Sequence, residues 1–258
     1  MQASKKPIIQ YCSDLHLEFL MNKRLLLENP IQPVGDILIL AGDVIPFIEI
    51  EKHNDFFDYV SQNFKEVYWI PGNHEYYQYD ISKRKGSFKI KVRPNVTLLN
   101  NSTIVIYNFK LIFSTLWTFV PPLEMRVVQN SMNDYHLINY ENQIFTPEIS
   151  NELFEENFAF IGEELSKNDG LQQFVITHHV PTFKNYPQEF IESAITSAFA
   201  VDLNKFIEKS TIHSWIYGHH HRNVKDFKIG NTNMLTNQLG YVQLGEQQKF
   251  DAKKVITI

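Results

Sequence analysis

The stretch DILILAGD, residues 36–43, decides the fold class of this chain. Its first six residues are almost all apolar, which is typical of a strand covered on both faces of its sheet. Similar short runs occur at PIIQYC (7–12) and EVYWI (66–70). Between residues 53 and 64 the apolar side chains recur at helical spacing instead. The first third of the chain therefore predicts strand, crossover, strand, helix and strand.

The remaining two thirds predict a second group of strands with further helices. Helices are predicted at 147–165 and 202–207, and strands at 96–99, 102–107, 110–114, 174–177 and 214–217, with edge strands at 233–236 and 254–257. Residues 115–145 show no clean period, and a loop of this length inside a compact domain is usually functional. The whole pattern favours two sheets packed together with helices outside.

Length and charge limit the kinds of protein that this chain can be. It has 258 residues and is 43% hydrophobic, which is enough for one substantial core, although length alone also permits two small domains. The net charge is −5, and the nearest approach to a basic patch is KRK (83–85) with Lys89, Lys91 and Arg93. We interpret that segment as a solvated helix or loop face. No stable nucleic-acid partner is therefore expected.

Cysteine usage and hydropathy indicate the compartment. The single cysteine, Cys12, lies in a predicted buried strand and excludes an internal disulfide, which fits a reducing compartment. No stretch approaches the roughly 20 apolar residues that a membrane-spanning helix needs. The apolar run near the N-terminus is also too short for a signal peptide. We expect a cytoplasmic protein with no membrane partner.

Several of the predicted apolar strands are followed directly by side chains that can bind a metal. The segments are SDLH (13–16), GD (42–43), GNHE (72–75), THH (177–179) and GHHH (218–221). Open α/β sheets build their sites at the carboxyl ends of the strands, so these five segments can converge. We interpret the glycines before Asp43, Asn73 and His219 as residues that permit tight turns and aim the next side chain at a metal.

The types of ligand indicate the kind of metal. Carboxylate oxygen, amide oxygen and imidazole nitrogen without any thiolate suit Mn, Fe, Co, Ni or Zn better than a structural cysteine-rich zinc site. About seven such ligands are too many for one ion but suitable for two. Asp43 is central among the segments, and a carboxylate can bridge two ions at the roughly 3.5–4 Å spacing of two-metal hydrolases.

Taken in order, these segments resemble the calcineurin-like metallophosphoesterase superfamily, whose pattern is D-x-H, G-D, G-N-H-[D/E], a His after a strand, and G-H-x-H. The resemblance implies a single domain over residues 1–258, folded as a four-layer αββα sandwich of two facing mixed sheets flanked by helices. It also implies that His74 lies beside the metals, where it contacts the phosphate or protonates the leaving oxygen. The implied ligands of one metal are Asp14, His16, Asp43 and His221, and those of the other are Asp43, Asn73, His178 and His219.

The function implied by the resemblance is hydrolysis of small-molecule phosphomonoesters or phosphodiesters. The implied cofactors are two divalent ions from among Mn, Fe, Zn, Co and Ni, with Mn favoured, which activate a hydroxide. One alternative is a nucleotide-specific phosphodiesterase or nuclease. Another is a scaffold that kept the fold and lost the chemistry, although such a protein should lack ligands that are present here.

Two assignments depend on which way neighbouring side chains point. Side chains alternate across a strand, so only one of His178 and His179 should enter the site, and we favour His178. By the same reasoning His220 should point away from its neighbours. Glu75 either orients a ligand or caps the following helix, and both interpretations remain open.

The unperiodic segment supplies the candidate substrate residues. Trp117, Asn133, Asp134 and Tyr135 are predicted to line the substrate pocket, while plain packing is the alternative for the two aromatic residues. These stretches, together with NQLGY (237–241), resemble a poorly characterised bacterial branch of the superfamily. Protein phosphatases of the superfamily carry G-D-x-V-D-R-G, whereas GDVIPF (42–47) stands here, so phosphoprotein substrates are disfavoured. The carboxylate that usually supports the catalytic His is absent with that motif, so the sequence identifies no residue that orients His74.

Overall fold

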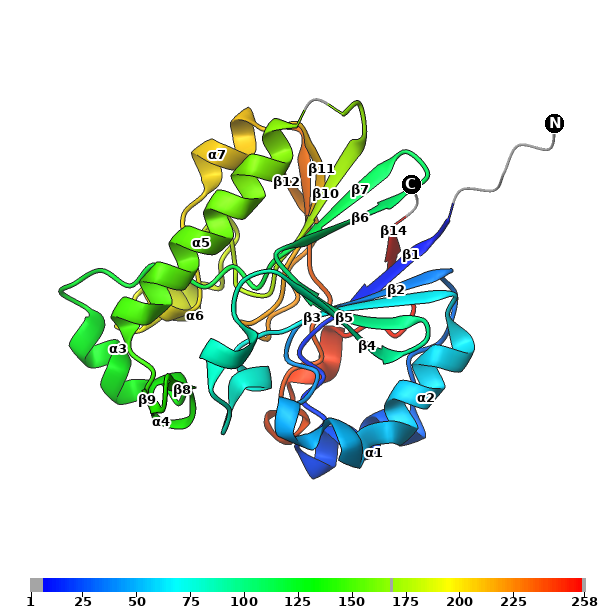
Figure 1. Cartoon of the computed structure of the whole chain (residues 1–258), viewed down its shortest axis with the longest axis horizontal. Coiled ribbons are helices and arrows are strands. Elements are labelled where there is room, and N and C mark those ends of the chain that lie inside the picture. The colour runs from blue at the N-terminus through cyan, green and yellow to red at the C-terminus, as the bar shows by residue number, and fades with distance from the viewer. Residues whose placement is uncertain (1–6, 168, 257–258) are drawn as a thin grey trace.

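The computed structural model describes residues 7–167 and 169–256, and two six-stranded sheets face each other at its centre (Figure 1). The order in the first sheet is β14-β1-β2-β3-β5-β4, and that in the second is β12-β13-β11-β10-β7-β6. Both sheets are mixed, because their central pairs are parallel and their outermost pairs are antiparallel. The predicted arrangement of two facing mixed sheets flanked by helices is therefore confirmed.

The strands have these bounds. The first sheet consists of β1 (Ile9–Cys12), β2 (Ile37–Ala41), β3 (Glu66–Ile70), β4 (Phe88–Arg93), β5 (Val96–Asn100) and β14 (Val255–Ile256). The second consists of β6 (Ser102–Ile106), β7 (Phe109–Phe113), β10 (Gln172–Ile176), β11 (Ile212–Ile216), β12 (Phe227–Ile229) and β13 (Thr232–Leu235). A separate hairpin pairs β8 (Asn139–Tyr140) with β9 (Gln143–Ile144).

Helices cover the outer faces of both sheets, with α1 and α2 beside the first and α5 and α7 beside the second (Figure 1). The α-helices are α1 (Leu20–Glu28), α2 (Asn54–Asn63), α3 (Met125–Ser131), α4 (Asp134–Leu137), α5 (Pro147–Ser166), α6 (Gln188–Ile191) and α7 (Asn204–Lys209). Short 3-10 turns are η1 (Phe47–His53), η2 (His74–Tyr76), η3 (Ile81–Arg84), η4 (Thr196–Ala198), η5 (Val242–Leu244) and η6 (Glu246–Lys249). In the described part of the chain, none of these helices is long and apolar enough to cross a membrane.

The four layers explain the nearly continuous apolar run at residues 36–41. In β2, Ile37 and Ile39 pack into the apolar layer between the two sheets, while Leu38 and Leu40 pack into the layer beneath the helices. Side chains alternate along a strand, so a strand with a covered layer on each side needs apolar residues throughout. The strand ends at Ala41, which leaves the following glycine and aspartate at the carboxyl edge of the sheet.

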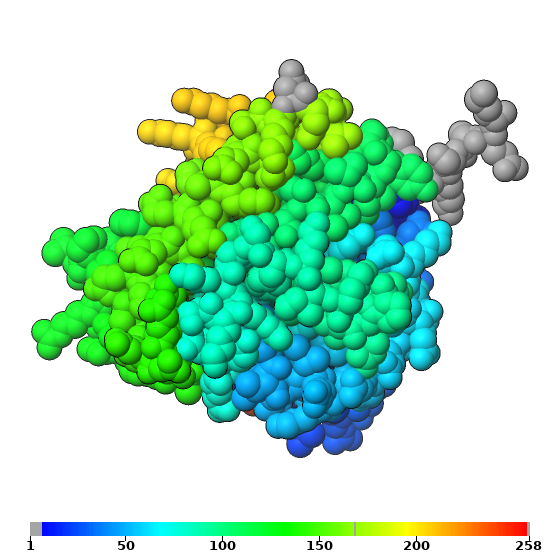
Figure 2. All heavy atoms as spheres, viewed as in Figure 1, coloured from blue at the N-terminus to red at the C-terminus, as the bar shows by residue number. Residues whose placement is uncertain are grey.

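Residues 83–93 differ from the prediction of a solvated helix or loop. They contain the end of η3 and then β4, which pairs antiparallel with β5 at the edge of the first sheet. In β4, Lys89 and Lys91 are exposed, while the intervening Ile90 is half buried. Residues 75–100, coloured cyan to blue-green, cover the centre of the face seen in Figure 2. The basic side chains concealed a two-residue alternation that is typical of a half-buried strand.

Three further segments differ from the sequence prediction. Residues 115–145 are not one loop, because they contain α3, α4 and the β8–β9 hairpin. The first crossover, between β1 and β2, contains the helix α1, where the sequence pattern predicts no helix. The strand predicted at an edge near 233–236 is β13, which lies between β11 and β12, and β12 forms the edge instead. These elements are only three to nine residues long, or two in the hairpin strands, so each is too short to show a clear period.

Candidate metal centre

The five predicted segments meet where β1, β2, β3, β10 and β11 end. Their backbone is unusual, because non-glycine residues there adopt left-handed φ angles, including 56° at Asp14, 53° at Asp43 and 80° at His219. Such conformations cost of order 1–3 kcal/mol each and persist only where surrounding contacts fix them, often at functional sites. His16 and His221 have the same feature, at 46° and 53°. The loops are therefore fixed in shapes that direct these side chains inward.

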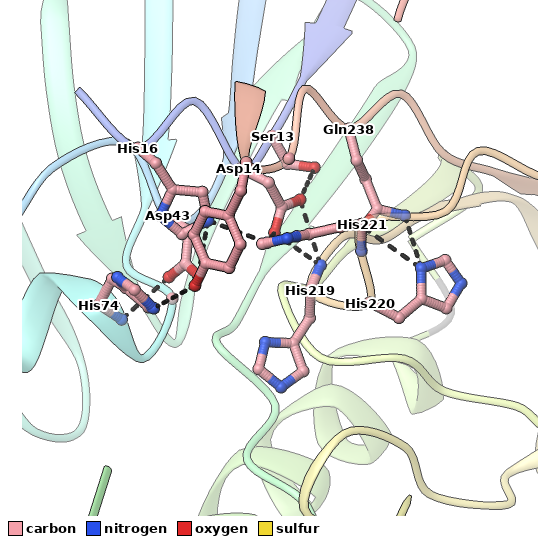
Figure 3. Close-up of polar contacts among 12 residues, drawn as sticks. Ser13, Asp14, His16, Asp43, His74, His219, His220, His221 and Gln238 are labelled. Carbon is pink, nitrogen blue, oxygen red and sulfur yellow. Dashed lines mark hydrogen bonds and ion pairs between the residues drawn. The ribbon is translucent and has the colours of Figure 1, made fainter. Parts of the chain in front are cut away.

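The structure brings the predicted ligands into two groups that share one residue. Figure 3 labels five of these ligands, namely Asp14, His16, Asp43, His219 and His221. Potential ligand atoms within each group lie within 4.8 Å of one another. Asp43 belongs to both groups, in agreement with its predicted bridging position. The amide oxygen of Asn73 lies 3.2 Å from Nε2 of His178 and so joins the second group. The first group is Asp14, His16, Asp43 and His221, and the second is Asp43, His178 and His219.

Hydrogen bonds outside the first group fix which nitrogen of each imidazole faces inward. His16 Nδ1 lies 3.1 Å from Glu18 Oε1, and His221 Nδ1 lies 2.8 Å from Glu246 Oε2. A neutral imidazole that donates through Nδ1 keeps a lone pair on Nε2. The two Nε2 atoms lie only 2.9 Å apart, so their lone pairs face each other. This contact is repulsive unless a metal ion or a proton lies between the two nitrogens.

In the second group, too, outer hydrogen bonds orient the candidate ligand atoms toward one another. His178 Nδ1 donates to the carbonyl oxygen of Ala41 at 3.0 Å, which leaves Nε2 facing Asp43 Oδ2 at 3.4 Å. Asn73 donates its amide nitrogen to Asp134 Oδ1 at 2.8 Å, so its oxygen faces the group. His219 Nδ1 lies 3.1 Å from His178 Nε2, and its buried Nε2 has no hydrogen-bond partner.

This donor set fits two divalent cations. Buried lone pairs that converge without a donor between them are costly, and a cation satisfies all of them at once. Oxygen and imidazole nitrogen are suitable ligands for Mn, Fe and Zn. The outer hydrogen bonds orient each ring, as is usual for metal-bound histidines.

The structure shows which of the neighbouring histidines belong with the candidate ligands. His179 is not a member of the second group, and its ring packs between those of Trp117 and His219, with centroids 5.0 and 4.3 Å away. Burial, together with nearby His178, lowers the pKa of His179 to about 3, so this ring is neutral. His220 points away and contacts Gln238 (Figure 3), and burial lowers its pKa to about 4. His178 is therefore the member of its pair that faces the candidate ligands.

Glu75 fixes the loops that carry the candidate ligands. Its Oε2 accepts hydrogen bonds from the backbone N–H groups of Asp43 and Gly72, at 2.9 and 2.6 Å. Its Oε1 accepts from the backbone of Val44 and from the indole of Trp69. The side chain is fully buried. Of the two open interpretations, the one in which Glu75 orients ligands agrees with these contacts, since it sets the backbone position of Asp43.

The four predicted substrate residues have different surroundings. Trp117 is buried against Phe145 and Tyr76, and Tyr135 stacks on Phe145 at 5.6 Å. Packing is therefore the role of these two aromatic side chains, and their assignment to the pocket wall is corrected. Asp134 is buried and holds the amide of Asn73 in place. Asn133 alone of the four lines the cavity above the candidate ligands.

Sequence reasoning did not find the residue that orients His74. Nδ1 of His74 lies 2.8 Å from Glu18 Oε1, the same oxygen that contacts His16. Burial alone would raise the pKa of Glu18, but hydrogen bonds from His16 and His74 lower this pKa to about 2. The side chain of Glu18 is therefore a carboxylate. Its position two residues after His16 was the available signal, because both side chains leave the same loop.

Gly72 is required by close approach rather than by its backbone angle. A Cβ atom added there would lie 2.2 Å from Asp43 Oδ1 and 2.7 Å from the ring of His178. We expect Gly72→Ala to lower the free energy of unfolding by about 2 kcal/mol or more, because these candidate ligands cannot move without losing their contacts. Chemical denaturation of the purified protein measures this.

Gly162→Ala in α5 is the matched control, since a Cβ atom there meets nothing within 4 Å. It should raise the unfolding free energy by about 0.5–1 kcal/mol, because alanine is the better helix former. Equal effects of the two substitutions would contradict the steric argument.

Comparison with known proteins identifies the family. The sequence pattern of the family described as "Calcineurin-like phosphoesterase" matches residues 9–223. The chain belongs to this family. A relative from Acanthamoeba polyphaga mimivirus, named "Uncharacterized protein L509", is 33% identical over 263 residues and covers 91% of each chain. The predicted family membership is therefore confirmed, and with it a hydrolase acting on phosphate esters.

A solved structure shares the fold. The phosphopantetheinyl hydrolase PptH from Mycobacterium tuberculosis superposes with a TM-score of 0.70 at 18% sequence identity, covering 98% of this chain and 97% of that chain. At this identity the likeness concerns the architecture alone. It supports the architecture of two facing sheets.

Proposed function

We propose that residues 1–258 form one catalytic domain that hydrolyses phosphate esters of small molecules with two divalent cations, Mn being favoured. The observation that carries this proposal is the convergence of buried lone pairs in two groups that share Asp43. The proposed ligands are those predicted from the sequence: Asp14, His16, Asp43 and His221 for one ion, and Asp43, Asn73, His178 and His219 for the other. When bound, the cations would activate water and stabilise the charge that gathers on the phosphate oxygens.

The proposed catalytic side chain of this protein is His74. Its backbone N–H donates to Asp43 Oδ1 at 3.0 Å, and its Nδ1 donates to Glu18, so the ring position is fixed from both sides. Burial alone would lower the pKa of His74, but Asp43 and Glu18 together raise it above its usual value. A protonated ring would carry its second proton on Nε2, which lies 3.2 Å from the hydroxyl of Tyr241 at the cavity wall. That proton can pass to the leaving oxygen.

We further propose that the protein is cytoplasmic and has no stable nucleic-acid partner. A single buried cysteine supports a cytoplasmic location. Lys89 and Lys91 lie on the edge strand β4, outside the cavity that adjoins the candidate ligands, which supports the absence of a stable nucleic-acid partner. Cell fractionation and a nucleic-acid mobility shift at low salt are the direct checks.

Metal-stripped protein assayed with added Mn, Fe(II), Co, Ni, Zn or Mg tests the proposal. The substrates are bis-p-nitrophenyl phosphate, p-nitrophenyl phosphate and a phosphopantetheinyl conjugate, the last because of the solved structure with the same fold. We expect two ions per chain, turnover that depends on them, and a Tm that rises by about 5 °C or more as they bind. Two bound ions without turnover of any ester would favour the scaffold alternative instead.

A further inference from the structure

The cavity beside the candidate ligands has two chemically different parts. Its volume is about 410 Å³, and Asp43, His74 and His219 lie on its polar side. The other side is built largely from one segment, residues 186–199, between β10 and α7. That segment contributes the apolar and aromatic side chains Tyr186, Phe190, Ile195 and Phe199, which we call the apolar wall.

The apolar wall is joined directly to the second candidate metal group. Phe199 stacks on His219 with ring centroids 4.7 Å apart and an interplanar angle of 29°. His74 lies on another side, where its ring is 4.1 Å from that of Tyr77. A phosphate held at the candidate ligands could therefore direct its leaving oxygen toward His74 and a second ester group toward the apolar wall.

The charge around the cavity is unfavourable for a substrate with several negative groups. No lysine or arginine lines it in the described part of the chain. Arg222, whose guanidinium lies 5.2 Å from the centroid of the Phe190 ring, is engaged by Glu246 at 2.9 Å and by Glu189 at 3.3 Å. Two divalent ions would supply four positive charges, but the carboxylates of Asp14 and Asp43 neutralise two of them. Further carboxylates at Glu18, Asp134 and Glu246 surround the same site.

We propose that the apolar wall binds the uncharged organic group of a monoanionic phosphodiester, so that the protein is a diesterase selective for apolar diesters. This inference rests on the proposed function and adds the substrate class. In the reaction, water forms a new P–O bond, the P–O bond to the leaving alcohol breaks, and His74 Nε2 supplies the proton of that alcohol. The proton lost by water goes to solvent, His74 regains a proton from solvent, and the products are a phosphomonoester and an alcohol. The monoester retains the group that contacts the wall.

The selectivity follows from desolvation. Aromatic and branched aliphatic side chains stabilise an apolar group that leaves water, and two or three such contacts discriminate well between a small and a large substituent. A second anionic group in the same place would be taken out of water, and the guanidinium of Arg222 beside Phe190 is already paired with Glu189 and Glu246. Phosphomonoesters and nucleotides with additional phosphates are therefore poorer substrates than neutral-ended diesters.

Diesters with a common p-nitrophenol leaving group test this inference in the metal-loaded protein. The retained groups are methyl, phenyl and 4-carboxyphenyl, and p-nitrophenyl phosphate is the monoester. We expect kcat/KM for the phenyl diester to exceed that for the methyl diester by about tenfold or more. It should exceed the values for the 4-carboxyphenyl diester and the monoester by at least as much.

Variants of Phe190 test whether the apolar wall causes the selectivity between these diesters. Phe190→Ala should reduce the phenyl-to-methyl ratio several-fold, Phe190→Leu should restore part of it, and Phe190→Arg should improve the 4-carboxyphenyl diester relative to the phenyl diester. Val105→Ala, at an exposed position in β6, is the control that keeps the wild-type ratio.

Two outcomes would overturn the inference, and they are distinguishable. Turnover with a phenyl-to-methyl ratio near one, or with the monoester preferred, would overturn the substrate class and leave the phosphoesterase function intact. Two bound ions without turnover of any of these esters would overturn the proposed function, and the substrate class with it.

Discussion

Replacing Asp43 by asparagine is expected to lower kcat/KM by about 10³-fold or more and to reduce the number of bound ions below two. Asp43 Oδ2 lies 3.7 Å from His16 Nε2 and 3.4 Å from His178 Nε2, so it is the carboxylate that both groups share. Asparagine keeps the size but removes the charge and replaces one oxygen by a donor. Steady-state kinetics and metal analysis of the purified variant measure the two effects.

Two other aspartates make this result interpretable. Asp58→Asn changes an exposed carboxylate in α2 that pairs with Arg93, and it should leave both activity and metal content unchanged. Asp14→Asn affects a carboxylate found in only one group, so it should weaken the binding of one ion and spare the other. If Asp43→Asn retained two ions and wild-type turnover, the shared-ligand assignment would be wrong.

The convergence of the candidate ligands was predictable because it depends on a local rule. Parallel strands of one sheet end at the same edge, so residues directly after β1, β2 and β3 must lie close together. Alternation along the chain then implies that only one of His178 and His179 joins the candidate ligands, and the contacts of the folded chain show that it is His178. Both rules act over a few residues, and the sequence contains that information.

The contacts that orient these side chains depend on the tertiary structure. Glu18 meets His74 across 56 positions of sequence, and Glu246 meets His221 across 25. Neither contact follows from a local rule, because the loops that bring the partners together are held by long-range contacts such as those of Glu75. The apolar wall was missed for a similar reason, since α6 and η4 are too short to show a period.

The positions of Trp117 and Tyr135 do not follow from the lack of a period in their segment. The sequence leaves both pocket lining and packing open for these two residues, and both rings are buried around Phe145. Short helices and turns can bury large aromatic side chains without a regular pattern, because each contributes only one or two of them. Absence of a period therefore indicates short elements here, and the segment reaches the cavity where α3 ends and α4 begins, at Ser131, Met132 and Asn133.

The role of His74 gives the second large expected effect. We expect His74→Ala to lower kcat by about 10²–10⁴-fold for a diester with an alkyl alcohol as leaving group. The loss should be much smaller for p-nitrophenol, because that group departs readily without a proton. Comparing the two leaving groups in the same variant separates proton donation from binding, which would affect both esters alike. Equal losses for both would contradict the role as a proton donor.

Glu18 should act through His74, and a double-mutant cycle tests this. Glu18→Gln removes the charge next to Nδ1 at 2.8 Å, so we expect the same dependence on the leaving group as in His74→Ala but a smaller loss. In the His74→Ala background, Glu18→Gln should have little further effect on that dependence. Because Glu18 also contacts His16, metal analysis must accompany the kinetics, and a variant that keeps two ions isolates the effect on His74. Glu28→Gln, at an exposed pair with Arg24, is the matched control. Independent, additive losses from Glu18 and His74 would mean that the carboxylate orients only the candidate metal ligand.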